Sequence, residues 1–343
     1  MTGGDRGEAV AAFVARHGWG CARRAPLAGD ASFRRYERLT DPSGATALVM
    51  DAPPPHEDTR PFAALAAYLT GEGFSAPTIY ATDHARGFLL IEDLGTATFT
   101  GLLANEPARE TALYTAAVDT LASLHRRPAP ASLPIPDAGT MAVEGYDGAV
   151  LTREACLMTD WYLPEMGLGG PEAGAALTAM LAPLVPAMQL QPPVLVLRDY
   201  HVDNLMHLPD RPGVRSVGLL DFQDALAGHP AYDLVSLLQD VRRAIPADLE
   251  EHLLARYLAA TGADPDSFRR AYRLLGVQRN LKIAGIFARL WRRDGKPRYL
   301  SMIPRAWTLI ARNLAEPEAA ALKAWIDRVV PPDRRLTPPQ PEE

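Results

Sequence analysis

The stretch LRDYHVDN at residues 197–204 decides the fold of this chain, together with the Asp221 that follows it. Within it, Asp199 stands five residues before Asn204. Short apolar runs bounded by polar residues predict short strands. Three such runs frame the motif, at residues 194–197, 205–208 and 217–220. We therefore expect Asp199 in a turn between two strands, and Asp221 at the end of a third.

An acid, an asparagine and a second acid in this order are typical of phosphoryl transfer. That reaction needs a carboxylate to accept the proton of the attacking hydroxyl, and oxygen ligands that hold Mg²⁺ on the phosphates. The sequence predicts Asp199 as the catalytic base, with Asn204 and Asp221 as the metal ligands. No cysteine stands nearby, and Cys21 and Cys156 show no metal-site spacing, which argues against zinc. The alternative, in which these side chains only stabilise turns, leaves their joint spacing unexplained.

The pattern around the motif predicts an α+β fold of two lobes. Residues 23–51 predict two or three antiparallel strands, and a helix over 59–70 and two further strands follow before residue 93. Beyond residue 106 the pattern is mainly helical, and we expect a structural role for Asp233 at the start of one helix. We predict a nucleotide-binding lobe over residues 1–93, a larger catalytic and substrate-binding lobe over 94–330, and a disordered tail over 331–343.

Composition excludes several other functions. A net charge of −6 gives no broad positive field for a phosphate backbone, so nucleic acid is not expected as a partner. No apolar segment predicts a signal peptide or a membrane span, so neither secretion nor a membrane partner is expected. The two cysteines cannot form a disulfide framework, which favours a reducing cytoplasm.

The N-terminal lobe offers several candidates for binding ATP. The turn with Gly29, Asp30 and Ser32 predicts a cover for the phosphates, although an ordinary hairpin turn explains it equally well. Residues 92–94, which are Glu92, Asp93 and Leu94, predict the hinge that meets adenine through its backbone.

Lysine is absent before Lys282, so the strand that usually carries a phosphate-binding lysine has none. We hypothesise that Arg34 or Arg35 takes that role, because a guanidinium can bridge phosphate oxygens. A solvated charge on the strand is the alternative for each.

Together these residues resemble the aminoglycoside phosphotransferase-like kinases, with a protein-kinase-like fold, over the chain to about residue 330. Narrower motifs are similar to those of the anomeric N-acetylmuramate/N-acetylglucosamine kinases of cell-wall recycling. These motifs are GDASFRRY at 29–36, MDAPP at 50–54, DFQDA at 221–225 and QRNLK at 278–282. One departure is Leu197, where many relatives have a histidine, while His201 keeps the later one, for which we expect a structural role.

The resemblance implies that ATP phosphorylates the anomeric hydroxyl of the amino sugar to an α-1-phosphate in peptidoglycan recycling. It also implies that a partner nucleotidyltransferase converts this product to a UDP-sugar. It assigns Asp199 as the base, Asn204 and Asp221 as Mg²⁺ ligands, and residues 92–94 as the hinge.

Sugar contacts are expected from the helical lobe. The candidates are Asp160 and Trp161 as an acid beside an aromatic platform, Asp224 just after the metal aspartate, and Arg279 in a basic region. Core packing is the alternative for Trp161, and a solvated helix charge is the alternative for Arg279.

Competing functions stay open on these residues. One is a kinase of another small alcohol, of the aminoglycoside, choline or homoserine type. A cationic substrate would favour an acidic pocket, whereas the C-terminal part of this chain is rich in arginine. A binding protein that kept the fold but lost turnover is the other alternative, and the joint presence of Asp199, Asn204 and Asp221 argues against it.

Overall fold

The chain forms two compact units from segments that alternate along the sequence. The computed structural model describes residues 3–27, 33–190 and 192–339. Unit 1 contains Met1–Thr120, Pro130–Val143 and Val202–Ala225, and unit 2 contains Leu121–Ala129, Glu144–His201 and Leu226–Glu343. Residues 94–120, which we expected in the C-terminal lobe, pack within unit 1. The functional lobe boundary at residue 93 remains a prediction, because a functional lobe and a unit defined by packing need not coincide.

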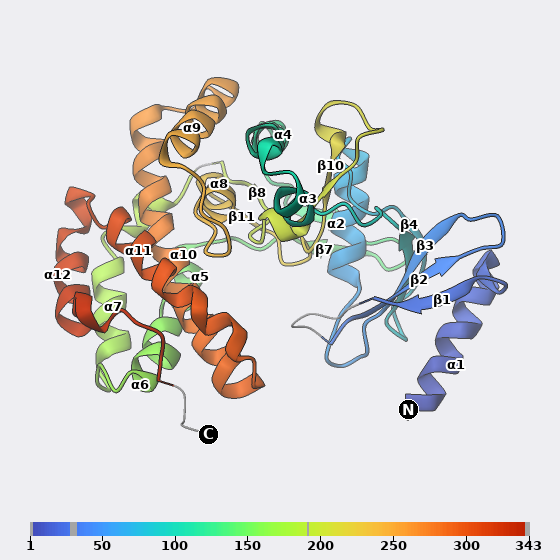
Figure 1. The fold of residues 1–343 in the computed structure, drawn as a ribbon, viewed down its shortest axis with the longest axis horizontal. Helices are drawn as coiled ribbons and strands as arrows, with labels where there is room; N and C mark the ends of the chain where they lie inside the picture. The colour runs from blue at the N-terminus through green and yellow to red at the C-terminus, as the bar shows by residue number, and fades with distance from the viewer. Residues whose placement is uncertain (1–2, 28–32, 191, 340–343) are drawn as a thin grey trace. The chain divides into compact units, whose positions relative to one another are not determined.

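Unit 1 is built on an antiparallel sheet, as predicted. Its strands are β1 (Arg23–Pro26), β2 (Arg35–Thr40), β3 (Thr46–Asp51), β4 (Ile79–Asp83) and β5 (Phe88–Glu92), in the order β1-β2-β3-β5-β4 (Figure 1). The predicted turn between β2 and β3 closes because an oxygen of Asp41 accepts the backbone N–H groups of Ser43 and Ala45.

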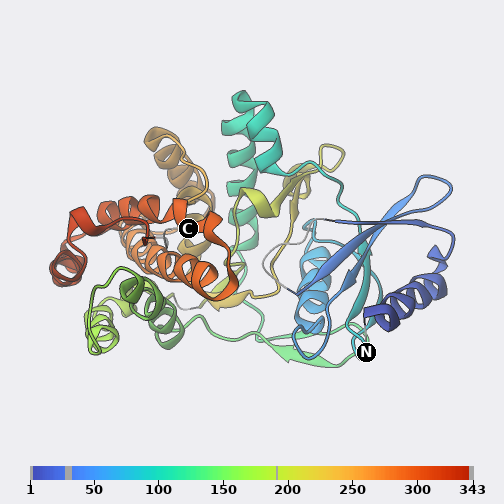
Figure 2. The ribbon, with the colours of Figure 1, turned by 60° about the horizontal axis from the view of Figure 1, so that its bottom comes forward.

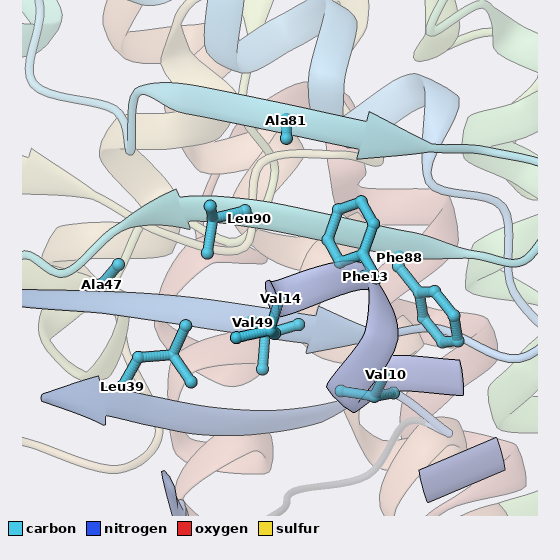
Figure 3. Packing of buried hydrophobic residues seen from close by; sticks show 9 residues of the cluster. All are labelled: Val10, Phe13, Val14, Leu39, Ala47, Val49, Ala81, Phe88 and Leu90. Atoms are coloured by element: carbon cyan, nitrogen blue, oxygen red, sulfur yellow. The ribbon is translucent and has the colours of Figure 1, made fainter. Parts of the chain in front are cut away.

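The two faces of this sheet have different roles. Helix α1 (Gly3–Val14) covers one face with Val10, Phe13 and Val14, which pack against apolar side chains of the strands (Figure 3). Successive side chains of a strand point to opposite faces. Residues that alternate with this core therefore face the other way, where Arg38, Leu48 and Ile91 line a cavity.

The remaining elements of unit 1 attach the segment with Asn204 and Asp221 to the sheet. They are α2 (Arg60–Gly71), α3 (Phe99–Asn105), most of α4 (Glu110–Leu124), the hairpin of β6 (Ser132–Pro134) and β7 (Thr140–Ala142), and the hairpin of β9 (Leu205–His207) and β10 (Val217–Leu219). Ser75 forms a bridge to Gly218, and Thr98 forms one to Met206. The segment with Asn204 and Asp221 is thus part of the unit that contains the sheet.

Unit 2 is helical and is organised around α10 (Pro265–Asp294). Its other helices are α5 (Gly148–Ala155), α6 (Leu163–Glu165), α7 (Ala173–Leu181), α8 (Ala231–Leu238), α9 (Ala247–Thr261), α11 (Ile303–Asn313) and α12 (Ala320–Val329). Asp264 caps the start of α10 by accepting the N–H of Ser267, and Gly295 ends it with φ 64°. Helices α5, α8 and α11 pack against α10 (Figures 1 and 2).

The one strand ladder described in unit 2 pairs β8 (Val194–Val196) with β11 (Leu226–Gly228). The sequence predicted β8 but not β11. A π-helical turn covers Met158–Tyr162, and residues Ala15–Trp19 follow α1 with a kink at His17 and Gly18. Short 3₁₀ turns cover Pro107–Arg109, Val185–Met188, Val202–Asn204, Gly213–Ser216, Pro297–Met302, Pro317–Ala319 and Pro332–Arg334. Within the described residues, none of the helices combines the length and the apolar character needed to span a bilayer.

Residues 331–339, the described part of the tail for which we expected disorder, contact the rest of unit 2, and the disorder stays a prediction. Tyr162 donates its hydroxyl to the carbonyls of Arg334 and Leu336, at 3.2 and 2.9 Å. Arg335 forms an ion pair with Asp327. The low apolar content of the segment hid these contacts, because they are made by arginine side chains and backbone carbonyls.

Candidate active site

Unit 1 contains a cavity of about 630 Å³, within the usual size range of small-molecule sites. Apolar side chains form much of its wall: Leu27, Leu48, Phe62, Pro77, Ile91, Leu94, Met206 and Leu220. Arg34, Asn204, Asp221 and Asp224 also line it. The cavity therefore combines an apolar surface for a flat ring with charged and amide groups for phosphates and a cation.

The β9–β10 hairpin brings Asn204 and Asp221 together. Leu205 and Leu219 are paired in the hairpin, and the N–H of Leu220 donates to the carbonyl of Asn204 at 3.0 Å. As a result, Nδ2 of Asn204 lies 3.5 Å from Oδ2 of Asp221. Asp221 has φ 55°, a left-handed conformation that aspartate tolerates better than most residues with a side chain and that is often found at functional sites.

The residues after Asp221 hold it in place. Phe222 is fully buried and its ring stacks on Phe62, with centroids 5.1 Å apart. Gln223 donates its side-chain amide to Oδ1 of Asp221 at 2.9 Å and lies 3.4 Å from Asp224. The motif DFQD thus provides one cavity-lining carboxylate, an apolar anchor, and an amide beside a second cavity-lining carboxylate. An amide oxygen and carboxylate oxygens are hard ligands of the kind that Mg²⁺ prefers.

Arg34 and Arg35 point to opposite sides of the sheet. Nη1 of Arg34 lies 3.7 Å from Oδ1 of Asp221, and its Nε lies 3.1 Å from Oε2 of Glu57. Arg35 is exposed and lines a separate small cavity beside Arg6. Of the two arginines proposed as replacements for the missing lysine, the structure brings only Arg34 to the cavity.

All three predicted hinge residues line the cavity, but two of their side chains are engaged elsewhere. Glu92 accepts from the hydroxyl of Thr78 at 3.0 Å and pairs with Arg211. Asp93 forms a two-point ion pair with Arg38, at 2.6 and 2.9 Å. Contacts to a bound base would therefore come from the backbone of this segment. Gly29, Asp30 and Ser32 lie outside the described residues.

Asp199 lies in unit 2 in a tightly held loop after β8. Arg198, just before it, has φ 69°. The buried carboxylate of Asp233, on α8, accepts the backbone N–H groups of Leu197 and Arg198 at 2.7 and 2.8 Å. His125 lies 3.5 Å from the same carboxylate. These bonds confirm the structural role expected for Asp233.

The charges around Asp199 keep it ionised. Burial raises the pKa of its carboxyl, but the positive charges of Arg279 and Lys282 outweigh that effect and hold the pKa below the ordinary value. His201 is buried, and this burial, followed by the charge of Arg242, lowers its pKa to about 4. An ionised carboxylate is the state in which Asp199 could accept a proton at neutral pH.

The predicted sugar contacts fall in different places. Asp224 lines the cavity of unit 1. Asp160 is exposed and Trp161 is half-buried, both in the π-helical turn Met158–Tyr162 of unit 2. That turn lies directly against α10, where a Cβ at Gly285 would come within 2.2 Å of the Leu157 carbonyl carbon. Arg279, also on α10, is buried and contacts the loop of Asp199.

Comparison with known proteins places this arrangement in a family. The phosphotransferase enzyme family matches residues 23–271, which is more than half of the chain. The chain belongs to the phosphotransferase enzyme family. The expected resemblance to aminoglycoside phosphotransferase-like kinases is thereby confirmed.

Two bacterial relatives match this phosphotransferase over nearly its whole length, and both are named N-acetylmuramate/N-acetylglucosamine kinase. The protein from Caulobacter vibrioides is 38% identical and the match covers 96% of this chain and 98% of the relative. The protein from Pseudomonas aeruginosa is 41% identical, with 90% of each chain covered.

Solved structures of low sequence identity share the fold of the phosphotransferase. An aminoglycoside 2'-phosphotransferase-IIIa in complex with GDP has a TM-score of 0.60 at 14% identity, covering 90% of this chain and 99% of that one. A choline/ethanolamine kinase family protein from Mesorhizobium loti has a TM-score of 0.58 at 14% identity, covering 96% and 99%. The predicted kinase-like α+β fold is confirmed.

Sequence reasoning missed several residues that shape the site. Glu57 pairs with Arg34, and Arg38 pairs with Asp93 of the predicted hinge. Glu154 pairs with Arg198 in the loop of Asp199. For Arg38, the alternation of charged and apolar residues along β2 was a usable signal. Glu154 gave no such signal, because its partners are far away in the sequence.

Proposed function

We propose that this phosphotransferase transfers the γ-phosphate of ATP to the anomeric hydroxyl of N-acetylmuramate or N-acetylglucosamine. The observation that carries the proposal is the pairing of near full-length similarity to kinases of that name with a cavity that holds Arg34, Asn204 and Asp221. The motif residues of the chain support the same assignment, because DFQDA and QRNLK contribute to the cavity and to the catalytic loop.

ATP and Mg²⁺ fit the groups that line the cavity. The apolar wall, with Leu48, Ile91 and Met206, suits the faces of adenine, and the backbone of residues 92–94 suits its edge. Asn204 and Asp221 would hold Mg²⁺ through oxygen atoms. When bound, the ion would neutralise charge on the phosphate oxygens. Gly29, Asp30 and Ser32, which lie outside the described residues, remain candidates for covering the phosphates.

Arg34 takes the part of the missing lysine in this proposal. Its side chain is held by Glu57 and faces Asp221, and a guanidinium can contact two phosphate oxygens at once. Arg35 was an equal candidate from the sequence, but its exposed position beside Arg6 does not support that role.

Asp199 supplies the base in the proposed reaction. Its carboxylate takes the proton of the anomeric hydroxyl as the sugar oxygen forms a bond to the γ-phosphorus and the bond from that phosphorus to the β-phosphate oxygen breaks. The products are the sugar α-1-phosphate and ADP. Asp199 is suited to this step because nearby cations keep it ionised.

Asp224, Asp160 and Trp161 remain proposed sugar contacts. Among them, Asp224 has the strongest support, since it lines the cavity that also contains the metal ligands. We further propose that the α-1-phosphate passes to a nucleotidyltransferase in cytoplasmic peptidoglycan recycling.

A panel of acceptors tests this assignment. Purified protein is incubated with Mg-ATP and N-acetylmuramate, N-acetylglucosamine, their one-methyl glycosides, an aminoglycoside, choline or homoserine, and ADP is measured. We expect ADP with one or both free sugars and none above background with the methyl glycosides, which lack the hydroxyl to be phosphorylated. Turnover with the glycosides, or with another alcohol only, would sink the proposal.

A further inference from the structure

The motif QRNLK on α10 is buried, although most of its residues are polar. Gln278, Arg279, Asn280 and Lys282 each have less than a tenth of their surface exposed. Arginine and lysine are almost never fully buried unless they are paired. Their burial at this point of α10 therefore requires partners, and for Arg279 these partners belong largely to the loop of Asp199.

Arg279 contacts the catalytic loop at two points. Its Nη1 donates to the backbone carbonyl of Arg198 at 2.9 Å, and to the hydroxyl of Tyr232 at 3.1 Å. Its Nη2 lies 3.6 Å from Oδ1 of Asp199. The guanidinium also lies 5.1 Å from the centre of the Tyr232 ring. A planar fork of donors can hold a backbone carbonyl and a carboxylate at the same time.

Arg198 shows why the loop needs such a contact. It has φ 69°, an unfavourable conformation for a residue with a side chain, which persists only when its surroundings impose it. Asp233 holds its N–H, while Glu154 pairs with its guanidinium, which lies over the ring of Tyr146. Arg279 holds the remaining backbone group, the carbonyl, and this peptide unit leads directly into Asp199.

We propose that Arg279 is a positioning residue for the catalytic base, fixing the left-handed peptide at Arg198 and orienting the carboxylate of Asp199. This inference rests on the proposed function in one respect, namely that Asp199 is the base. It replaces the substrate contact that the sequence indicated for Arg279. The side chain is 6% exposed, and its two terminal nitrogens already face Arg198, Tyr232 and Asp199.

Lys282 has a separate part in the same cluster. Its Nζ lies 3.0 Å from Oε1 of Glu154, so it secures the carboxylate that holds the side chain of Arg198. Arg279 acts on the backbone and on Asp199 directly. Substitution of Arg279 should therefore lower kcat more strongly than it lowers the stability of the fold.

The first test compares Arg279→Met and Arg279→Lys with Arg270→Met. Arg270 is on the same helix but forms a surface ion pair with Glu318, which makes it a matched control. For Arg279→Met we expect kcat to fall about 100-fold, because a displaced base loses its alignment. The KM for ATP should change less than about threefold. Arg279→Lys keeps the charge but not the planar fork of donors, so its kcat should lie between those of Arg279→Met and the wild type. The control Arg270→Met should have the kcat of the wild type.

A pH profile separates positioning from loss of folded protein. The titratable and charged groups near Asp199 are Arg279 and Lys282 on α10, Arg198 and His201 in its own loop, Glu154 on α5, and Tyr146, Tyr232 and Asp233. Removing the cation of Arg279 raises the pKa of Asp199, so the acid limb of kcat should move to higher pH in Arg279→Met and stay in place in Arg279→Lys. Simple loss of folded enzyme would lower kcat at every pH alike.

Hydrogen exchange gives a readout that needs no sugar. Amide exchange of the peptide around residues 197–201 should become faster in Arg279→Met, and less so in Arg279→Lys, while it stays unchanged in Arg270→Met. If Arg279→Met does not fold, the lysine variant alone decides. A wild type without sugar kinase activity would defeat the proposed function but leave the exchange test valid. Wild-type kcat, acid limb and loop exchange in both Arg279 variants would overturn the inference.

Discussion

The cavity of unit 1 and the loop of Asp199 in unit 2 are held by different kinds of contact. In the cavity, side chains contact other side chains: Gln223 lies 2.9 Å, Asn204 3.5 Å and Arg34 3.7 Å from Asp221. In the loop, bonds of 2.7 to 2.9 Å fix the backbone on both sides of Arg198. Contacts between side chains can rearrange when a nucleotide and a cation bind. Bonds to the backbone fix the loop of the proposed base, whose position must already be correct when the substrate arrives.

The largest effect is expected in the loop, from substitution of Asp199, the proposed base. Asp199→Asn keeps the size of the side chain but removes the proton acceptor, and kcat should fall about 1,000-fold or more. Nucleotide affinity should stay within about twofold, because the cavity is lined by other residues. Steady-state kinetics and calorimetric titration with ADP measure the two quantities. Substantial turnover in Asp199→Asn would displace it as the base.

The next largest effect is expected from Asp233, which holds the backbone of the loop. Asp233→Ala leaves two buried N–H groups without their acceptor, so the free energy of unfolding should fall by about 3 kcal/mol. Urea denaturation measures the change. The control Glu318→Ala removes a surface ion pair and should cost less than about 1 kcal/mol. Equal, small losses in both variants would show that the loop does not depend on Asp233.

Substitutions of the two arginines should have a smaller effect, and only Arg34 should change the KM for ATP. Arg34→Met should raise the KM for ATP about tenfold, since one charged phosphate contact is lost. Arg35→Met is the matched control on the other face of the sheet, and it should leave that KM within about twofold. The reverse result would assign the phosphate contact to Arg35, and wild-type values in both variants would remove arginine from the phosphate site.

The smallest expected effect is that of pH on the wild type. The pKa of Asp199 is held below its ordinary value, so its carboxylate stays unprotonated as the pH falls towards that value. At saturating Mg-ATP, kcat should therefore change less than about twofold between roughly pH 8 and pH 6. A steep loss near neutral pH would indicate a base of higher pKa, such as an imidazole.

The sequence predicted much of the fold because periodicity and turns reveal elements directly. The antiparallel sheet, the helix α2 and the strands around Asn204 and Asp221 all followed from local patterns. Strand β11 did not, because Leu226–Gly228 is short and its partner β8 is remote in the sequence. The contacts of residues 331–339 were missed because Tyr162, which binds two of their carbonyls, is remote in the sequence.

The residues of the candidate site likewise fall into those that a local pattern indicated and those that depend on long-range contacts. Residue types and spacing indicated Asp199, Asn204 and Asp221. Spacing could not separate Arg34 from Arg35, because which of two adjacent strand residues faces a cavity depends on how the sheet is covered. Nor could it show that Arg279 lies against Arg198, eighty-one residues earlier in the chain. Long-range pairing of charges leaves no local pattern.

The position of the transferred phosphate tests the central claim most directly. Purified protein is incubated with Mg-ATP and N-acetylmuramate, and separately with N-acetylglucosamine, and the product is examined by phosphorus and proton NMR. The account predicts a phosphorus nucleus coupled to the anomeric proton of an α-linked sugar 1-phosphate, with at least one of the two sugars. Phosphorus coupled to the protons at carbon six, or no sugar phosphate with either substrate, would contradict it.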